Sequence, residues 1–171
     1  MTVFTHIPHD DFVAAIRTLA DLLAADTWKP DFIIGVGRGG LAPAVYLSHA
    51  TGLPMLSVDY SSQVKDFADA PLERLAARTQ DGTRLLFLDD INDSGRTIAH
   101  LREKLAAGGA TQGSIRFATL IDNVSSVQTV DYRARTIDRT VTKDWFIFPW
   151  EAVAPDLAIQ ADAAAVPERI A

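Results

Sequence analysis

Residues 85–97, Leu-Leu-Phe-Leu-Asp-Asp-Ile-Asn-Asp-Ser-Gly-Arg-Thr, constrain the fold of this chain more than any other stretch. Leu85 to Leu88 form a continuous apolar run, which is typical of a strand buried on both faces of a parallel sheet. Ligands in such α/β folds bind just beyond the carboxyl ends of the strands. Asp89 and Asp90 follow the apolar run directly. We therefore expect both carboxylates at a ligand site.

A turn of small residues and the start of a helix follow the two acids. Ser94, Gly95 and Thr97 are small or hydroxylic, and apolar residues at helical spacing predict a helix from about Arg96. The first N–H groups of a helix have no partner within the helix, so this turn is suited to binding an anion such as phosphate. Carboxylates beside a phosphate cradle fit a ribose 5-phosphate, whose vicinal hydroxyls can donate to the two acids.

The same stretch resembles the 5-phosphoribosyl-1-pyrophosphate (PRPP) motif of the type I phosphoribosyltransferases. That pattern is four apolar residues, two acids, two variable residues, Asp, Ser or Thr, Gly, a variable residue and Thr, and this sequence matches it throughout. A buried strand before an acidic helix cap would not explain three aspartates at this spacing. The resemblance implies that Asp89 and Asp90 hold the ribose and, largely through PRPP and water, Mg²⁺. It implies a PRPP site made of Asp89, Asp90, Asp93, Ser94, Gly95, Arg96 and Thr97.

Helices and strands are predicted to alternate on both sides of this stretch. Apolar residues recur at helical spacing after Asp10, which can serve as an N-cap, and short apolar runs near Gly or Pro are typical of strands. The predicted elements are a helix from Asp10 to about Ala25, strands over 32–36, 55–59 and 115–121, and a helical segment over 72–77. Such alternation implies right-handed crossovers and a parallel sheet, and so an α/β fold.

The resemblance specifies this as the type I phosphoribosyltransferase fold, a parallel twisted sheet flanked by helices with a small C-terminal hood. We expect one domain over residues 1–151, with its core at about 10–121 and its hood at about 122–151. The Ala-rich tail, 152–171, is expected to be at most a loosely packed helix.

Two further segments carry expectations of their own. Strand-like patterns at 125–132 and 140–148 are expected to build the hood. Residues 60–81 are polar and poorly periodic at first, which predicts a mobile loop. By resemblance this loop closes over the reacting centre, and it contains Ser61, Ser62 and Lys65.

A Gly-rich turn, 35–40, joins the first predicted strand to a helix expected from Leu41 to about Thr51. Its sequence fits the dinucleotide fingerprint G-x-G-x-x-G, and an acid ends the next strand, where a ribose-binding residue is expected. That interpretation leaves the three aspartates of 89–93 unexplained, and an Arg in the turn would crowd a bound pyrophosphate. Arg38-Gly39-Gly40 instead resembles the loop that holds the pyrophosphate leaving group in the phosphoribosyltransferases.

An aromatic stretch near the C-terminus narrows the resemblance. Arg-Gly-Gly-Leu, the PRPP motif and a late Trp-x-x-x-Pro-Trp-acid recur in this order in the bacterial xanthine-guanine phosphoribosyltransferases and their hypoxanthine-using relatives. By resemblance, Trp145 stacks on the purine, the backbone of Phe146 contacts its edge, and Trp150 and Glu151 end the hood. Asp93 would lie near purine N7 and act as the catalytic residue that assists proton movement. By themselves, aromatic residues at this density are more often core.

The chain departs from those enzymes at one position. Their Lys after the fourth strand reads the 6-oxo group of the base, whereas residues 121–124 here are Ile-Asp-Asn-Val. Asn123 can donate one hydrogen bond to the base, and Lys143 can reach in from the hood. An acid at Asp122 would disfavour xanthine, which is partly anionic near neutral pH, if its carboxylate faces the pocket. The choice among guanine, hypoxanthine and xanthine stays open.

Composition excludes several other classes of protein. A net charge of −6 argues against a general binder of nucleic acid or of anionic membranes. No apolar run of membrane-spanning length and no basic-then-apolar N-terminus is present, so we expect a cytoplasmic protein. Without cysteine the chain has neither disulfides nor thiolate metal sites, and its histidines lack ligand spacing.

The expected activity is the transfer of a phosphoribosyl group from PRPP to a 6-oxopurine base in purine salvage. The products are a nucleoside 5′-monophosphate and pyrophosphate, and the implied cofactor is Mg²⁺. The resemblance also implies a homodimer or a homotetramer. Two alternatives are a PRPP-sensing protein of the same fold without catalysis and a dinucleotide-binding protein.

Overall fold

The computed structural model describes residues 2–60 and 69–166, and its centre is a five-stranded sheet. All neighbouring strands are parallel, in the order β3-β2-β4-β5-β6. The strands are β2 (Phe32–Val36), β3 (Met55–Val58), β4 (Leu85–Asn92), β5 (Ile115–Asn123) and β6 (Tyr132–Ile137). The predicted α/β fold with a parallel sheet is confirmed.

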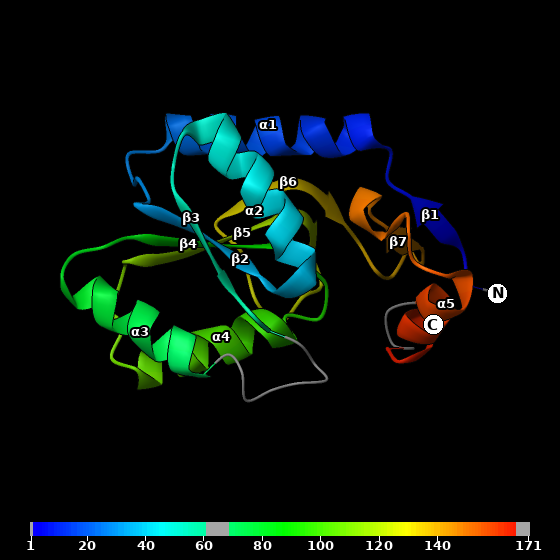
Figure 1. The fold of residues 1–171 in the computed structure, drawn as a ribbon. Coiled ribbons are helices and arrows are strands. Elements are labelled where there is room, and N and C mark those ends of the chain that lie inside the picture. The colour runs from blue at the N-terminus through cyan, green and yellow to red at the C-terminus, as the bar shows by residue number, and fades with distance from the viewer. Residues whose placement is uncertain (1, 61–68, 167–171) are drawn as a thin grey trace.

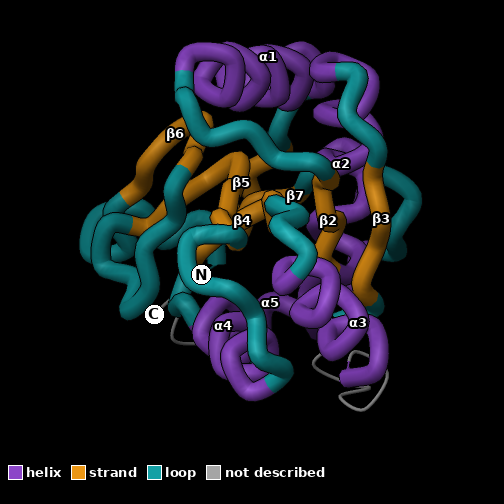
Figure 2. Tube along the Cα trace, turned by 90° about the vertical axis from the view of Figure 1, so that its left-hand side faces the viewer, coloured by secondary structure: helices purple, strands orange, loops and turns teal. Residues whose placement is uncertain are grey.

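Helices cover both faces of this sheet. The helices are α1 (His9–Ala25), α2 (Gly37–Thr51), α3 (Asp69–Gln80) and α4 (Arg96–Ala107). Figures 1 and 2 show α1 and α2 on one side of the strands and α3 and α4 on the other. Successive residues of β2 pack into the two different cores, Ile33 on the α1 side and Ile34 on the α4 side. Strands buried on both faces therefore carry apolar runs without alternation.

The hood is a second, smaller unit built from both ends of the chain. Strand β1 (Phe4–His6) pairs in parallel with β7 (Trp145–Ile147), followed by a short 3₁₀ helix, η2 (Pro149–Glu151), and α5 (Asp156–Ala164). These elements lie together at one end of the molecule (Figure 1). The sequence predicts a strand over 140–148, and only 145–147 form one. The contribution of β1 was not predicted, because three residues are too few for a recognisable period.

The predicted strand at 125–132 is wrong. Residues 124–131 form a loop that returns along β5, and the strand that follows, β6, joins the main sheet and not the hood. The main sheet therefore extends past the core limit expected near residue 121. Strand β6 lies at the edge of the sheet and carries Arg133 and Arg135. Charged residues suit an exposed edge. Because they interrupt the apolar pattern of β6, the sequence did not predict this strand.

Several boundaries also differ from the sequence-based prediction. Strand β4 continues to Asn92, so the paired acids lie inside the strand and not beyond it. Helix α2 begins at Gly37 and not at Leu41, and α3 extends over residues 69–80. The expected loop residues Ser61, Ser62 and Lys65 lie outside the described residues. Within 2–60 and 69–166, no helix has the length and apolar character needed to cross a bilayer.

Candidate functional site

The two acids of β4 face the first turn of α2. A Cβ atom built on Gly39 would lie 2.5 Å from Oδ2 of Asp90 and 3.0 Å from Oδ1 of Asp89. A Cβ atom on Gly40 would lie only 2.0 Å from the backbone oxygen of Leu88. Both glycines are therefore required for the close packing of α2 on β4. Arg38 lies on the same turn of α2.

The close contacts at Gly39 and Gly40 concern the side on which a Cβ atom would lie. The expected role of their backbone groups toward a pyrophosphate is a separate matter. Close packing of helix on strand is also the role of the third glycine in the dinucleotide fingerprint, so this packing does not separate the two interpretations of residues 35–40.

The loop after β4 is braced from the side by the return loop, 124–131. The carboxamide of buried Asn92 donates to the backbone oxygen of Gln128 at 2.7 Å, and its oxygen accepts from the hydroxyl of Ser126 at 3.0 Å. Gly95 has φ +84°, and a Cβ atom there would lie 2.8 Å from the backbone nitrogen of Gln128. Residues 92–95 are thus held in one conformation by a segment more than thirty residues later in the chain.

Helix α4 starts directly after this loop with Gly95 as its N-cap. Gly95 has no side chain to cap this terminus, the Ser94 hydroxyl accepts from the N–H of Arg96 only at 3.5 Å, and the first turn carries no acidic residue. Its terminal N–H groups and the positive end of its dipole therefore favour an anion. Ser94 and Gly95 precede α4, and Arg96 and Thr97 are its first residues.

Asp93 forms a buried ion pair that the sequence does not predict. Nε of Arg139 donates to Oδ1 and Oδ2 of Asp93 at 3.0 and 3.2 Å, and Nη2 donates to Oδ2 at 2.8 Å. The two side chains are 3% and 10% exposed. The other terminal nitrogen, Nη1, donates to the backbone oxygens of Thr142 and Asp144. Arg139 therefore ties the end of β4 to the segment that leads into the hood.

Asn123, which we expected to bind the base, supports this ion pair instead. Its carboxamide nitrogen donates to the backbone oxygen of Asp93 at 3.0 Å, and its oxygen accepts from the backbone nitrogens of Ser125 and Arg139 at 3.2 Å each. It is buried and does not line the pocket described below. Asp122 also faces elsewhere, since it accepts from Asn92 at 2.8 Å. The expected effect of its carboxylate on xanthine therefore has no structural support.

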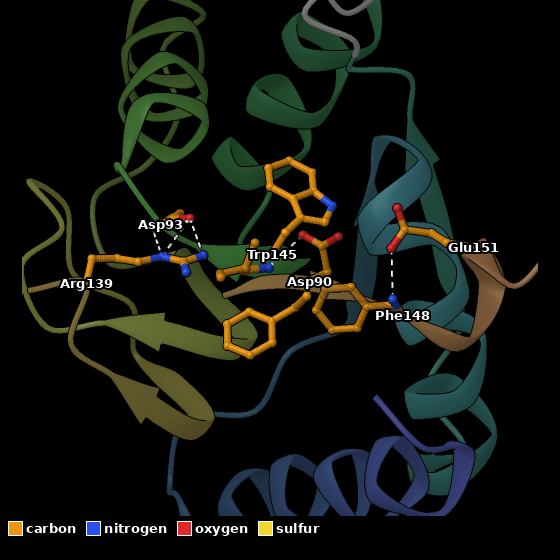
Figure 3. A pocket seen from close by; sticks show the side chains of 8 residues that line it. Asp90, Asp93, Arg139, Trp145, Phe148 and Glu151 are labelled. Carbon is orange, nitrogen blue, oxygen red and sulfur yellow. Dashed lines mark hydrogen bonds and ion pairs between the residues drawn. The ribbon is translucent and has the colours of Figure 1, made fainter. Parts of the chain in front are cut away.

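A hollow of about 410 Å³, open to solvent, lies between the end of β4 and the hood. Eight residues line it: Asp90, Ile91, Asp93, Arg139, Trp145, Phe146, Phe148 and Glu151. Figure 3 shows the Trp145 indole beside Asp90 on one side and the guanidinium of Arg139 reaching in from the other. Carboxylates, one guanidinium and aromatic rings thus share a single pocket.

The aromatic stretch has two parts with different environments. Phe148 stacks on Trp150 at a ring distance of 4.8 Å, and Trp150 also packs edge-on against Phe12 of α1, 5.3 Å away. These rings belong to the core, as the density of aromatic residues indicates. Trp145 is only half-buried and presents its ring to the pocket.

The backbone of Phe146 also faces away from its partner strand. In the β1–β7 ladder, Trp145 donates to Val3, and Ile147 accepts from Ile7. Backbone groups of successive residues point to opposite sides of a strand, so those of Phe146 point away from β1. This orientation fits the backbone contact with the base that we expect of Phe146.

Charged groups surround the pocket. Burial raises the pKa of Glu151 above its ordinary value, and Asp162 adds to this, while the N–H of Phe148 and the charge of Arg38 oppose it. Arg38 therefore lies near Glu151 of the hood. Burial and the charge of Asp89 also raise the pKa of Tyr60.

The donor set fits a magnesium ion only as a partner of a bound ligand. Among the described residues, no group of three His, Cys, Asp or Glu side chains could hold a metal. Asp89 and Asp90 are a pair of oxygen donors. Mg²⁺ typically uses one or two carboxylates, with water and substrate phosphates completing its octahedron. The expected arrangement, in which the metal is held largely through PRPP and water, agrees with this pair.

Sequence reasoning missed three residues of this site. Arg139 lies in a charged segment that resembles a surface turn, and the ion pair with Asp93 connects positions 46 apart. Tyr60 follows the polar end of β3, and Glu151 was expected only to end the hood. The aromatic motif, which ends in Glu151, was the one available signal for a pocket residue.

Comparison with known proteins gives a consistent result. Residues 8–155 match the family model described as the phosphoribosyl transferase domain. The chain is 29% identical over 135 residues to the xanthine-guanine phosphoribosyltransferase of Idiomarina loihiensis, covering 75% of this chain and 74% of that protein.

Solved structures agree with the family match. A purine phosphoribosyltransferase from Pyrococcus horikoshii superposes with a TM-score of 0.64 at 28% identity, covering 88% of this chain and 96% of that one. A xanthine-guanine-hypoxanthine phosphoribosyltransferase from Helicobacter pylori shares the fold, with a TM-score of 0.65 at 18% identity over 93% and 99% of the two chains. With its PRPP motif on β4 and α4, and with a family match over nearly its whole length, this chain belongs to the phosphoribosyltransferases, a family of pentosyltransferases of the type I fold.

Proposed function

We propose that this protein transfers the phosphoribosyl group of PRPP to a 6-oxopurine base, in cytoplasmic purine salvage. The observation that carries the proposal is an open pocket that is lined by Asp90 of β4, by Asp93 and by the half-buried Trp145 of the hood. A ribose held at the acids would present its anomeric carbon toward the hood. A purine stacked on Trp145 would then approach that carbon.

The PRPP half of the site comes from three elements. The turn before α4, residues 93–97, takes the 5-phosphate on helix N–H groups. Asp89 and Asp90 accept from the ribose hydroxyls. Arg38 meets the pyrophosphate together with Gly39 and Gly40 on the first turn of α2, where Gly39 packs against these acids. Mg²⁺, when bound, offsets the negative charge that gathers on the leaving pyrophosphate.

The reaction breaks the bond between the anomeric carbon and the pyrophosphate oxygen, and it forms the bond from that carbon to N9 of the base. Pyrophosphate leaves with the electron pair, and the base loses a proton. The ribose develops positive charge as the bond breaks, which the carboxylates of β4 stabilise. Asp93 remains the proposed catalytic residue that assists the proton near N7. Its ion pair with Arg139 fixes the carboxylate in place for this task.

The assay for this function is a panel of guanine, hypoxanthine, xanthine and adenine with PRPP and Mg²⁺. We expect nucleoside monophosphate and equimolar pyrophosphate from at least one 6-oxopurine, and no reaction after chelation of the metal. Asp89→Asn should weaken PRPP binding, because the amide loses the charge assistance of the carboxylate. Asp21→Asn on the exposed face of α1 is the matched control and should leave PRPP binding unchanged.

The same panel separates the competing functions. PRPP at a hundredfold excess over its dissociation constant should stabilise the fold by about 2.7 kcal/mol, and NAD should not. Stabilisation by PRPP without turnover of any base would identify the PRPP-sensing alternative. Indifference to PRPP would refute the site itself.

The proposal includes self-association as a homodimer or homotetramer. Leu41, Val45 and Tyr46 on α2 are exposed, as is Leu56 on the adjacent edge strand β3. Apolar side chains gathered on one face favour contact with a second copy. Light scattering coupled to gel filtration measures the mass, and a monomer at assay concentration would contradict this part of the proposal.

A further inference from the structure

We propose that Arg139 is a specificity-determining residue that reads the 6-oxo group of the base with one N–H of its guanidinium. The inference deepens the proposed function and rests on a purine being bound in the hood pocket. Residues 121–124 contain no lysine that could read the 6-oxo group. The inference therefore places the contact with this group on the hood side of the pocket.

The hydrogen bonds of Arg139 leave one donor for a ligand. An arginine side chain has five N–H groups, one on Nε and two on each terminal nitrogen. Nε donates to Asp93, and the two N–H groups of Nη1 donate to the backbone oxygens of Thr142 and Asp144 at 3.2 and 2.6 Å. Nη2 uses one N–H on Oδ2 of Asp93. Within the described residues, its second N–H has no acceptor in the protein.

The guanidinium of Arg139 borders the pocket. Arg139 is the only cationic side chain among the pocket-lining residues that the structure describes. Its guanidinium carbon lies 5.3 Å from the centre of the Phe146 ring, and in Figure 3 the group points toward Asp90 and Trp145. A purine stacked on Trp145 would therefore meet Arg139 at its edge and not at its face.

The surroundings hold the guanidinium in this orientation. Its charge is paired with Asp93, its side chain is 10% exposed, and the backbone nitrogen of Arg139 donates to Asn123. Asn123 in turn holds the backbone oxygen of Asp93 at 3.0 Å. Because the same polar group fixes both members of the ion pair, the remaining N–H has a defined direction. Asn123 is thus a positioning residue for the contact with the base.

A guanidinium can only donate hydrogen bonds, and this determines which base it accepts. The 6-oxo group of guanine or hypoxanthine is an acceptor and matches the remaining N–H. The 6-amino group of adenine presents donors, so in the complex two donors would face each other. Sites built to pair with one polar group reject analogues that leave buried groups unpaired by large factors. Arg139 therefore selects 6-oxopurines over 6-aminopurines.

The test compares two nucleotides by calorimetry, so that it does not depend on turnover. GMP and the 5′-monophosphate of 2,6-diaminopurine riboside differ only at the 6-position and the adjacent N1 proton. We expect the parent protein to bind GMP at least about 100-fold more tightly. In Arg139→Gln the preference should fall by about 10- to 100-fold, because a carboxamide can offer either a donor or an acceptor. Arg135→Gln is the matched control, since Arg135 also lies over Phe146, at 5.0 Å, but does not line the pocket.

A purely structural role for Arg139 gives a different result. Loss of packing would weaken the binding of both nucleotides equally and leave the ratio of their affinities unchanged. That result would overturn the inference. If Arg139→Gln does not fold, Arg139→Lys keeps the charge beside Asp93 but lacks the fork, so one nitrogen has to serve both Asp93 and the base. A smaller fall in the ratio is then expected, because an ammonium still only donates. Equal binding of the two nucleotides by the parent protein would also overturn it. Selective binding that Arg139→Gln abolishes, in a protein that turns over no base, would support the inference while refuting the proposed activity.

Discussion

Asp93→Asn tests the strongest electrostatic feature of this structure. The substitution keeps the shape of the side chain but places an amide N–H₂ group against a guanidinium that also donates. The Arg139 side chain is only 10% exposed, so its charge would remain largely desolvated and without a counterion. Removing one partner of a buried ion pair typically costs about 3–5 kcal/mol. Since Nη1 keeps two backbone acceptors, we expect the lower end of this range, about 3 kcal/mol.

The measurement is reversible unfolding in urea together with a thermal scan. For a chain of 171 residues, a loss of about 3 kcal/mol corresponds to a fall in Tm of roughly 6–12 °C. Asp89→Asn is the matched control, because Asp89 is half-buried on β4 and its Oδ1 accepts from the N–H of Asp90 at 3.0 Å, a hydrogen bond that an amide oxygen can also accept. It should cost less than about 1 kcal/mol. Turnover of Asp93→Asn is then measured at a temperature where the variant is fully folded, and it should fall by about 10²–10⁴-fold for a lost acid or base.

A double-mutant cycle with Arg139→Gln measures the interaction free energy of the two side chains separately from the other contributions of each residue. If the ion pair is the main interaction, the second substitution should add little to the first, with a coupling free energy of about 1–3 kcal/mol. A loss below about 1 kcal/mol for Asp93→Asn, or additive losses in the double variant, would refute this account. Asp93 would then serve mainly as a cap for the turn before α4, where Asn is nearly as good.

Three further predictions concern other parts of the chain. Trp145→Ala should lose about 1–3 kcal/mol of base binding, with little change in PRPP affinity. Trp150→Ala should chiefly lower the free energy of unfolding. Equal effects of the two substitutions on stability would place Trp145 in the core. Gly40→Ala, with a strand oxygen 2.0 Å from the added Cβ, should destabilise by about 1–3 kcal/mol in urea unfolding. Gly39→Ala meets movable carboxylates and should instead weaken PRPP binding in calorimetry. Hydrogen bonds from Trp28 and Arg116 lower the pKa of Asp26 from 3.8 to about 2. The stabilisation by this carboxylate is therefore complete above pH 3.8 and is lost as the pH falls through 2. In Asp26→Asn the free energy of unfolding should depend less on pH in that window.

The ion pair of Asp93 and Arg139 also has a place in the architecture. It joins the turn that follows β4 to the segment that enters β7, and a ligand in the hood pocket would contact both. Movement of the hood away from the sheet would therefore expose a charge on each side. The relative position of the two halves of the site is thus stabilised by electrostatics as well as by the aromatic packing of Trp150.

The local sequence by itself determined the motif, the order of the elements and the two halves of the pocket. Residues 85–97 are contiguous, and a buried strand, a turn and a helix start are each encoded within a few neighbouring positions. The same holds for the aromatic stretch that lines the hood. Because these signals are local, the α/β fold and the family could be predicted without a structure.

Only the tertiary structure decided which of these residues meet. Arg139 pairs with Asp93 across 46 positions, β1 joins the hood from the other end of the chain, and Asn123 turns from the base toward the ion pair. The requirement for Gly40 comes from an oxygen of Leu88 on another element. The periodicity of the sequence does not predict these contacts, because each one depends on how separate elements pack. Burial then decides whether a charged or polar residue faces solvent, a partner or a ligand.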